Sequence, residues 1–103
     1  MSKIALNVKA PKSMIDELGS MAKDEFLEIS SFIQSELSKF YARIQSGEEF
    51  LFTEYDRGEE AMDVIPVRIN ATLKKELKSL ADSKKINFSD FIRQILNYII
   101  LKK

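Results

Sequence analysis

The chain has 103 residues, of which 45% are hydrophobic, a size and composition that suit one compact domain or two very small ones. It contains no Cys and no His, which excludes disulfides, thiol nucleophiles, imidazole acid–base chemistry and most zinc sites. No apolar run approaches the roughly 18–20 residues of a membrane span, and the N-terminus lacks the apolar core of a signal peptide. We therefore expect a soluble cytoplasmic protein.

The charges cancel overall but are unevenly distributed along the chain. Residues 46–63 carry seven acidic side chains and one basic one, whereas residues 64–103 carry nine basic and three acidic side chains. Residues 1–45 are balanced, with six of each sign. Charge blocks bear on the partners of a protein more than on its fold. On charge alone, we favour lysines that simply solvate helix faces over a polyanionic partner.

The first predicted element is the strand KIALNVKAP, residues 3–11, which Pro11 ends. Apolar side chains alternate along it with small or polar ones, the pattern of a strand with one buried face. A lone strand leaves its backbone N–H and C=O groups without partners, so this strand must pair with another. One face carries Ile4, Leu6 and Val8, and the other carries Ala5, Asn7 and Lys9.

Two helices are predicted after this strand, with a break around EFLE at residues 25–28. In both helices apolar side chains recur at helical spacing, and Ser46 and Gly47 form a typical C-cap for the second. The apolar stripes are Met14, Leu18, Met21 and Ala22, then Phe32, Ile33, Leu37, Phe40, Tyr41 and Ile44. We interpret such stripes as core and not as a cofactor site.

The second half of the chain repeats this order of elements. VIPVRIN, residues 64–70, predicts a strand, and Asn70 and Thr72 can cap the helix that follows. After a break at KKIN, Asn87 with Asp90 three residues later predicts an N-cap with a capping-box partner. The apolar stripes are Leu73, Leu77, Leu80 and Ala81, then Phe88, Phe91, Ile92, Ile95, Leu96, Ile99 and Ile100.

A shift of 59 residues aligns the two halves without gaps. The identical pairs lie in every element, and most of them are apolar. They include Val8 and Val67, Leu18 and Leu77, Ala22 and Ala81, Ser30 and Ser89, Phe32 and Phe91, Ile33 and Ile92, and Leu37 and Leu96. We predict a first unit at residues 1–45, an acidic linker at 46–63 and a second unit at 64–103, with both units forming one intertwined domain.

The linker contains aromatic and apolar residues whose role is open: Phe50, Leu51, Phe52 and Tyr55. They either fold over the core or offer a surface to another molecule, and we favour the first. Each unit alone, one strand with two half-covered helices, cannot close a core. Two units can do so by pairing their strands antiparallel and interlocking four helices. We therefore expect a mainly α fold with a two-stranded antiparallel ribbon formed within one chain.

The segments LNVKAPKSMIDEL…MA…ISSFIQSEL and IPVRINATLKKEL…LA…NFSDFIRQIL resemble the ribbon-helix-helix DNA-binding family, which includes the Arc and MetJ repressors. The resemblance covers residues 3–45 and 62–103. The family usually works as a homodimer, so the resemblance implies a tandem pseudo-dimer in one polypeptide, similar to small transcription regulators of archaeal viruses. It implies a sequence-specific regulator of transcription that binds double-stranded DNA and self-associates on it, in the host cytoplasm if the protein is viral.

The family reads base edges in the major groove with alternate side chains of its ribbon. The resemblance implies that the base-reading residues here are Ala5, Asn7, Lys9, Val64, Pro66 and Arg68. Asn suits adenine, Lys and Arg suit guanine, and Ala suits the thymine methyl group. Val64 and Pro66 offer only apolar contact, which departs from the family's polar pattern and makes the ribbon asymmetric. The alternative for the polar members is an ordinary solvated strand face.

The resemblance also implies a phosphate clamp at the N-terminus of each unit's second helix, where free N–H groups and the helix dipole favour an anion. The clamp residues implied are Lys84, Lys85, Asn87, Phe88 and Ser89 in the second unit, and Lys3, Lys12 and Ser30 in the first. Asp24 and Glu25, just upstream of the first clamp, would repel a phosphate. We therefore expect the second unit to supply more of the electrostatic affinity.

A protein-interaction module, either antitoxin-like or a viral adaptor, is the second hypothesis, with the acidic linker as its partner surface. An enzyme has little support, because the chain has no His, no Cys, no glycine-rich phosphate loop and no metal-ligand spacing. The sequence therefore predicts no catalytic residue, no metal, no cofactor, no small-molecule substrate and no membrane partner.

Overall fold

Each half of the chain forms one strand followed by two helices, in the order the sequence predicts. The computed structural model describes residues 3–51 and 61–101. Within them the chain is mainly helical, with four helices and one two-stranded sheet. The elements are β1 (Lys3–Pro11), α1 (Lys12–Asp24), α2 (Ile29–Gln45), β2 (Met62–Asn70), α3 (Ala71–Ser83) and α4 (Phe88–Leu101).

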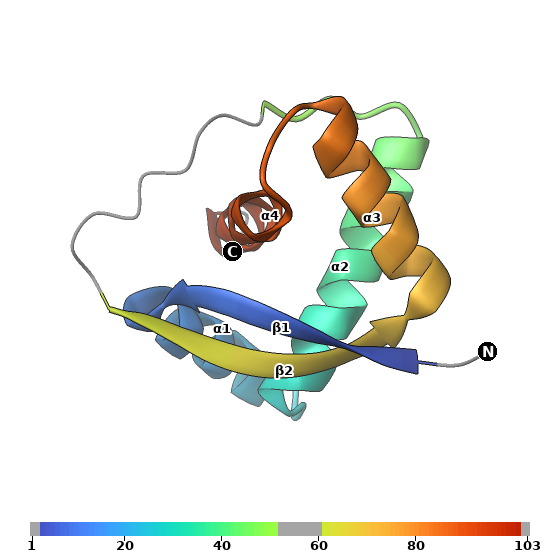
Figure 1. Ribbon diagram of the computed structural model, residues 1–103. Helices are drawn as coiled ribbons and strands as arrows, with labels where there is room; N and C mark the ends of the chain where they lie inside the picture. The colour runs from blue at the N-terminus through green and yellow to red at the C-terminus, as the bar shows by residue number, and fades with distance from the viewer. Residues whose placement is uncertain (1–2, 52–60, 102–103) are drawn as a thin grey trace.

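The two strands pair antiparallel and form a twisted ribbon that crosses the lower part of the molecule in Figure 1. Lys3 lies opposite Asn70 and Pro11 opposite Met62, so the strands match over their full length. The prediction that β1 finds its partner in the same chain is confirmed. The second strand begins at Met62, two residues earlier than predicted, because the pairing with Pro11 extends it.

One face of the ribbon is buried beneath the helices, and the other is exposed, as strand alternation requires. The buried hydrophobic residues of the two strands are Leu6, Val8, Ala10, Val67 and Ile69. Ile4, predicted in the core, is 37% exposed, because it lies near the end of the ribbon, where the helices cover less of it.

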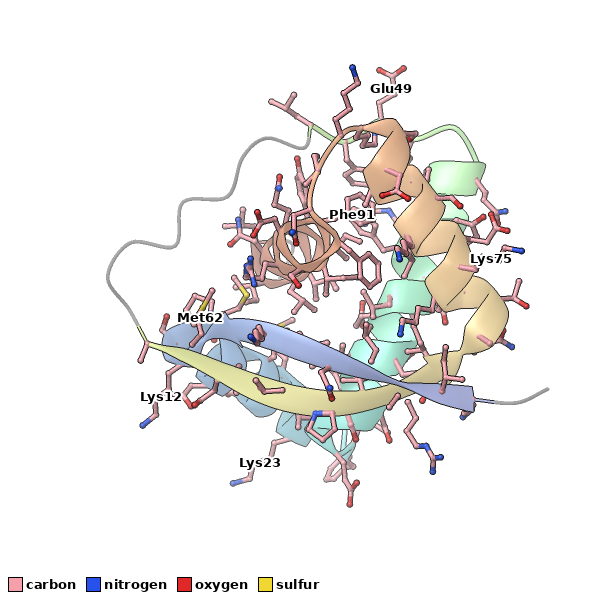
Figure 2. All side chains as sticks on the ribbon, in the orientation of Figure 1. Lys12, Lys23, Glu49, Met62, Lys75 and Phe91 are labelled. Carbon is pink, nitrogen blue, oxygen red and sulfur yellow. The ribbon has the colours of Figure 1, made fainter. Side chains whose placement is uncertain are left out.

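The helices supply the rest of one continuous hydrophobic core. The second helix of each half packs on the strand of the other half, since α2 contacts β2 and α4 contacts β1. Neither half therefore buries its apolar surface alone. Figure 2 shows Phe91 pointing from α4 into the interior. The buried helix residues are Met14, Leu18, Ala22, Phe32, Ile33, Leu37, Phe40, Leu77, Ala81, Phe91, Ile92, Ile95, Leu96 and Ile99.

The turns between helices are the same in both halves. Phe26 and Lys85, which are 59 residues apart, adopt positive φ angles of 60° and 58°. The residue after each donates its N–H to a carbonyl five residues earlier: Leu27 to Ala22 at 2.9 Å, and Ile86 to Ala81 at 3.0 Å. This is the helix C-terminal motif with a left-handed residue. Each turn sets the direction in which the second helix leaves the first.

The predicted caps are confirmed on the second unit. Thr72 donates its N–H to the Asn70 side chain at 2.7 Å, and Ser89 donates to the Asn87 side chain at 2.9 Å. Asp90, predicted as a capping-box partner, pairs with Arg93. In the first half, Gly47 has a φ of 104° after the α2 C-cap at Ser46, as expected for a helix that ends there.

The start of the linker folds over the core. The Phe50 ring lies 4.3 Å from the Phe40 ring and 5.3 Å from the Tyr98 ring, measured between centroids. The Tyr98 hydroxyl donates to the Leu51 carbonyl, while the Leu51 side chain is 77% exposed. The favoured prediction is thus confirmed for Phe50. Phe52 and Tyr55 lie outside the described residues.

Candidate nucleic-acid interface

All six predicted base-reading residues lie on the exposed face of the ribbon. The antiparallel register arranges them as three cross-strand pairs: Ala5 opposite Arg68, Asn7 opposite Pro66, and Lys9 opposite Val64. Each strand thus contributes one cationic or polar group next to apolar ones. The strand that contains a proline can still pair because a two-stranded ribbon leaves one edge of each strand without a ladder partner.

The 59-residue repeat and the strand register coincide at the centre of the ribbon. Asn7 and Pro66 are counterparts in the repeat, and they also face each other directly. By the same shift Lys9 corresponds to Arg68. These two cations therefore lie on opposite sides of the central pair, roughly 13 Å apart along the ribbon at about 3.3 Å per residue.

Two buried or half-buried polar side chains hold the backbone beneath these cations. The Arg93 guanidinium, only 2% exposed, donates to the Lys9 carbonyl at 3.1 Å and forms an ion pair with Asp90. Gln34, with its amide oriented to satisfy its neighbours, donates to the Arg68 carbonyl at 3.0 Å. Gln34 and Arg93 are themselves 59 residues apart. Equivalent positions thus support equivalent strand carbonyls.

Sequence reasoning missed Gln34 and Arg93 as site residues. A signal for them existed, because both lie within the apolar stripes of the second helices at the same repeat position. A long polar side chain placed there in both halves must find a polar partner in the interior. Only the packing of each helix on the other half's strand shows that the partner is the ribbon backbone.

A surface pocket of about 460 Å³ lies where α2 begins beside the ribbon, at the position predicted for the first phosphate clamp. Its lining residues are Lys3, Ser30, Ser31, Gln34 and Arg68. Lys3 also donates to the Gln34 amide oxygen at 3.0 Å, which holds its ammonium group at the pocket.

The same end of the ribbon carries a further cation. The Lys74 ammonium donates to the Ala5 carbonyl at 3.5 Å, and Ala5 lies opposite Arg68. Lys3, Arg68 and Lys74 therefore form a cationic end of the ribbon.

The start of α4, predicted as the second phosphate clamp, carries different side chains from the start of α2. The residues that correspond to Lys3 and Ser31 are Met62 and Asp90. The Ser89 N–H is already taken by Asn87, and the Asp90 carboxylate is paired with the buried Arg93.

Lys84 lines a separate pocket of about 310 Å³ together with Glu48 and Glu49. Lys85 occupies the exposed turn before α4, and Phe88 is half-buried against the core. Lys12 is exposed at the Met62 end of the ribbon and points away from it (Figure 2). Two linker carboxylates therefore lie beside one of the lysines expected at the second clamp.

Other kinds of site find no support in the part of the chain that the structure describes. No group of three or more Asp or Glu side chains there is arranged to hold a metal ion. None of the helices there has the length and apolar character needed to cross a membrane.

No family model, curated protein or solved structure matches this chain.

Proposed function

We propose that this protein is a sequence-specific DNA-binding regulator of transcription that inserts its two-stranded ribbon into the major groove. The observation that carries this proposal is the exposed ribbon face, on which Lys9 and Arg68 flank a central Asn7 at repeat-related positions. These are side-chain types that read guanine and adenine edges. The opposite face is buried, so the ribbon is held rigidly by the core.

The dimensions of the ribbon suit a major groove. Two paired strands lie about 4.8 Å apart, and the groove is about 12 Å wide, which admits a two-stranded ribbon. Lys9 and Arg68 are separated along the ribbon by roughly four base-pair steps of 3.4 Å. Each can therefore contact a guanine in a different half of one site.

The two units act, in this proposal, as the halves of a pseudo-dimer whose approximate two-fold axis passes between Asn7 and Pro66. The equivalent turns at Phe26 and Lys85 and the equivalent supports at Gln34 and Arg93 favour this view. A homodimer would read a symmetric site with two identical strands. In a fused pair the two strands can differ in sequence, and every molecule carries one copy of each strand.

Phosphate contacts supply the sequence-independent part of the affinity. Lys3 and Lys74 at one ribbon end lie beside the start of α2, where the helix dipole also favours an anion. At the other end of the ribbon, Lys12 is an exposed cation that can contact a phosphate.

The proposal is tested by selecting bound DNA from a random pool and titrating the enriched sequence by fluorescence anisotropy at several salt concentrations. We expect an enriched motif and an affinity that falls steeply with salt, by about 0.9 log units per neutralised phosphate for each log unit of salt. Binding at low salt that enriches no sequence would leave a non-specific polyanion binder, and no binding would remove the proposal.

A protein-interaction role is the second candidate, and one observation favours it. Phe26 is 96% exposed at the turn between α1 and α2, with Leu27 beside it at 41%. An exposed aromatic side chain of this kind is a common anchor in protein interfaces. Phe26→Ser separates the roles: it should leave DNA affinity unchanged if DNA is the partner, and abolish capture of a protein partner if Phe26 is the anchor.

A further inference from the structure

Resting on the proposed DNA-binding function, we infer that the ribbon binds its site in one orientation only, and that the preferred site is a near-palindrome with an asymmetric centre. The two arms of the reading face are chemically alike, whereas its centre and its two flanks are not. A homodimer cannot make this distinction, because its strands are identical. The difference arises from particular residues of this chain.

The arms of the reading face are equivalent under the two-fold relation. Lys9 and Arg68 correspond to each other, and both are cations suited to guanine. Ala5 and Val64 correspond likewise, and both are apolar side chains suited to a thymine methyl group. Each arm therefore presents one cation beside one small apolar group, opposite in strand but alike in chemistry. Both half-sites should favour the same bases.

The centre of the reading face is unequal. The Asn7 amide carries a donor and an acceptor, which can bind an adenine edge bidentately. Pro66, directly opposite, has neither a side-chain hydrogen-bonding group nor a backbone N–H. Hydrogen bonding at the centre therefore reaches a base from one side of the axis only. A site with adenine on that side is preferred, and its mirror arrangement is not.

The two ends of the ribbon, which flank the reading face, are also unequal. Lys3 and Ser31 line the pocket at the start of α2, and their counterparts near α4 are Met62 and Asp90. Lys74 adds its charge to the α2 end. Arg93 adds little to the α4 end, because it is 2% exposed and paired with Asp90. Turning the protein round on its site would move the strong phosphate contacts to the other flank and place Pro66 on the adenine.

One bidentate contact discriminates between bases by about fivefold to 150-fold in affinity. We therefore expect the two orientations to differ in occupancy by at least about fivefold. The phosphate contacts at the flanks add to the affinity, but they do not depend on base sequence. The central contact by Asn7 therefore selects the orientation, whereas the flanks increase the affinity of the complex.

Affinity cleavage measures the orientation of the bound protein directly. Because this chain contains no Cys, an introduced thiol is the only site that the label can modify. Lys23→Cys and Asp82→Cys introduce single thiols at exposed, repeat-related positions near the ends of α1 and α3. Each full-length variant is labelled with an iron chelate and bound to the selected DNA. We expect each label to cut on one side of the site, and the two labels to cut on opposite sides. Figure 2 shows that the Lys23 side chain points away from the core.

Equal cutting on both sides by each label, on DNA that is specifically bound, would overturn the inference and leave the proposed function intact. Failure of both variants and of the unmodified chain to select any sequence would instead overturn the proposed function. Asn7→Ala gives an independent measurement, since Asn7 is exposed and its loss should not affect folding. A selection with this variant should lose the central adenine while keeping the guanines of both arms. An unchanged central preference would contradict the role of Asn7.

Discussion

Asn7 and Pro66 face each other directly at the middle of the ribbon, and the same two residues are counterparts in the 59-residue repeat. In the proposed pseudo-dimer, this coincidence would place the two-fold axis on the central pair of the exposed ribbon face. The two members of this pair differ in hydrogen-bonding capacity, since Asn7 carries a side-chain amide and Pro66 has no hydrogen-bonding side-chain group. The ribbon is thus nearly symmetric in its arms and polar at one side of its centre.

Loss of either cation proposed to read bases should weaken binding to the selected site. Arg68→Ala and Lys9→Ala should each cost about 1–3 kcal/mol of binding free energy and relax the preference for guanine in one arm. Helical content should be unchanged, because both side chains are exposed. Anisotropy titrations with cognate and substituted sites measure both effects.

Lys75→Ala is the matched control for these variants. It removes the same charge from an exposed position on α3, where Figure 2 shows the side chain pointing away from the rest of the protein. Its effect on affinity should be small and equal for all sequences. A loss from Lys75→Ala as large as that from Arg68→Ala would mean that general charge, and not the ribbon, determines affinity.

Lys3→Ala tests the cationic end of the ribbon. Lys3 lines the pocket beside the start of α2 and contacts Gln34. Its removal should lower affinity similarly for every sequence and reduce the slope of log affinity against log salt by about 0.9. Lys84→Ala, beside Glu48 and Glu49 in another pocket, should change the slope less. The reverse order of the two slopes would restore the second clamp as the stronger one.

Arg93 should matter for stability through its ion pair and its bond to the ribbon. Arg93→Ala leaves the Lys9 carbonyl and the Asp90 carboxylate without this donor, and should lower the free energy of unfolding by about 2–4 kcal/mol. Arg93→Gln should cost less, about 1–2 kcal/mol, because Gln34 makes the equivalent bond in the other half. Urea denaturation at neutral pH compares the two. Equal losses would show that the strand carbonyl contributes nothing.

The two halves should unfold as one unit. Phe32 and Phe91 are counterparts, 1% and 0% exposed, in one continuous core. Truncation of either to Ala should cost about 3–5 kcal/mol and lower the stability of the whole chain. Denaturation followed by circular dichroism and by tyrosine fluorescence should give coincident transitions. Two separate transitions would mean that each unit has a core of its own.

The start of the linker should contribute to stability through Phe50. Its ring contacts Phe40 and Tyr98, and the Arg43 guanidinium lies 5.0 Å from its centroid. Phe50→Ala should lower the free energy of unfolding by about 1–3 kcal/mol. Leu51→Ala, at a side chain that is 77% exposed, is the neighbouring control and should change stability by less than about 0.5 kcal/mol. Similar losses would place the stabilising contact elsewhere in the linker.

Much of this fold was predictable because the signals are local. Strand alternation, helical stripes and the caps at Asn70 and Asn87 depend on nearest neighbours in the chain, and the structure confirms them. Ile4 shows the limit of such signals. Its place in the alternation predicted burial, but coverage by the helices ends before it. The electrostatics of the clamps could not be predicted in this way, since Lys3 and Arg68 meet Ser30 only through folding.

By itself the sequence determined the two units, the face that each strand buries and the chemistry of the exposed face. A shift of one residue in the pairing of β1 with β2 would turn the polar face of one strand toward the core, so the alternation alone excludes it. A shift of two residues leaves the same side chains on each face, so the alternation cannot distinguish it from the observed register. The tertiary structure has the register in which Asn7 lies opposite Pro66, and in it Arg93 and Gln34, from the packed helices, bond to the carbonyls of Lys9 and Arg68.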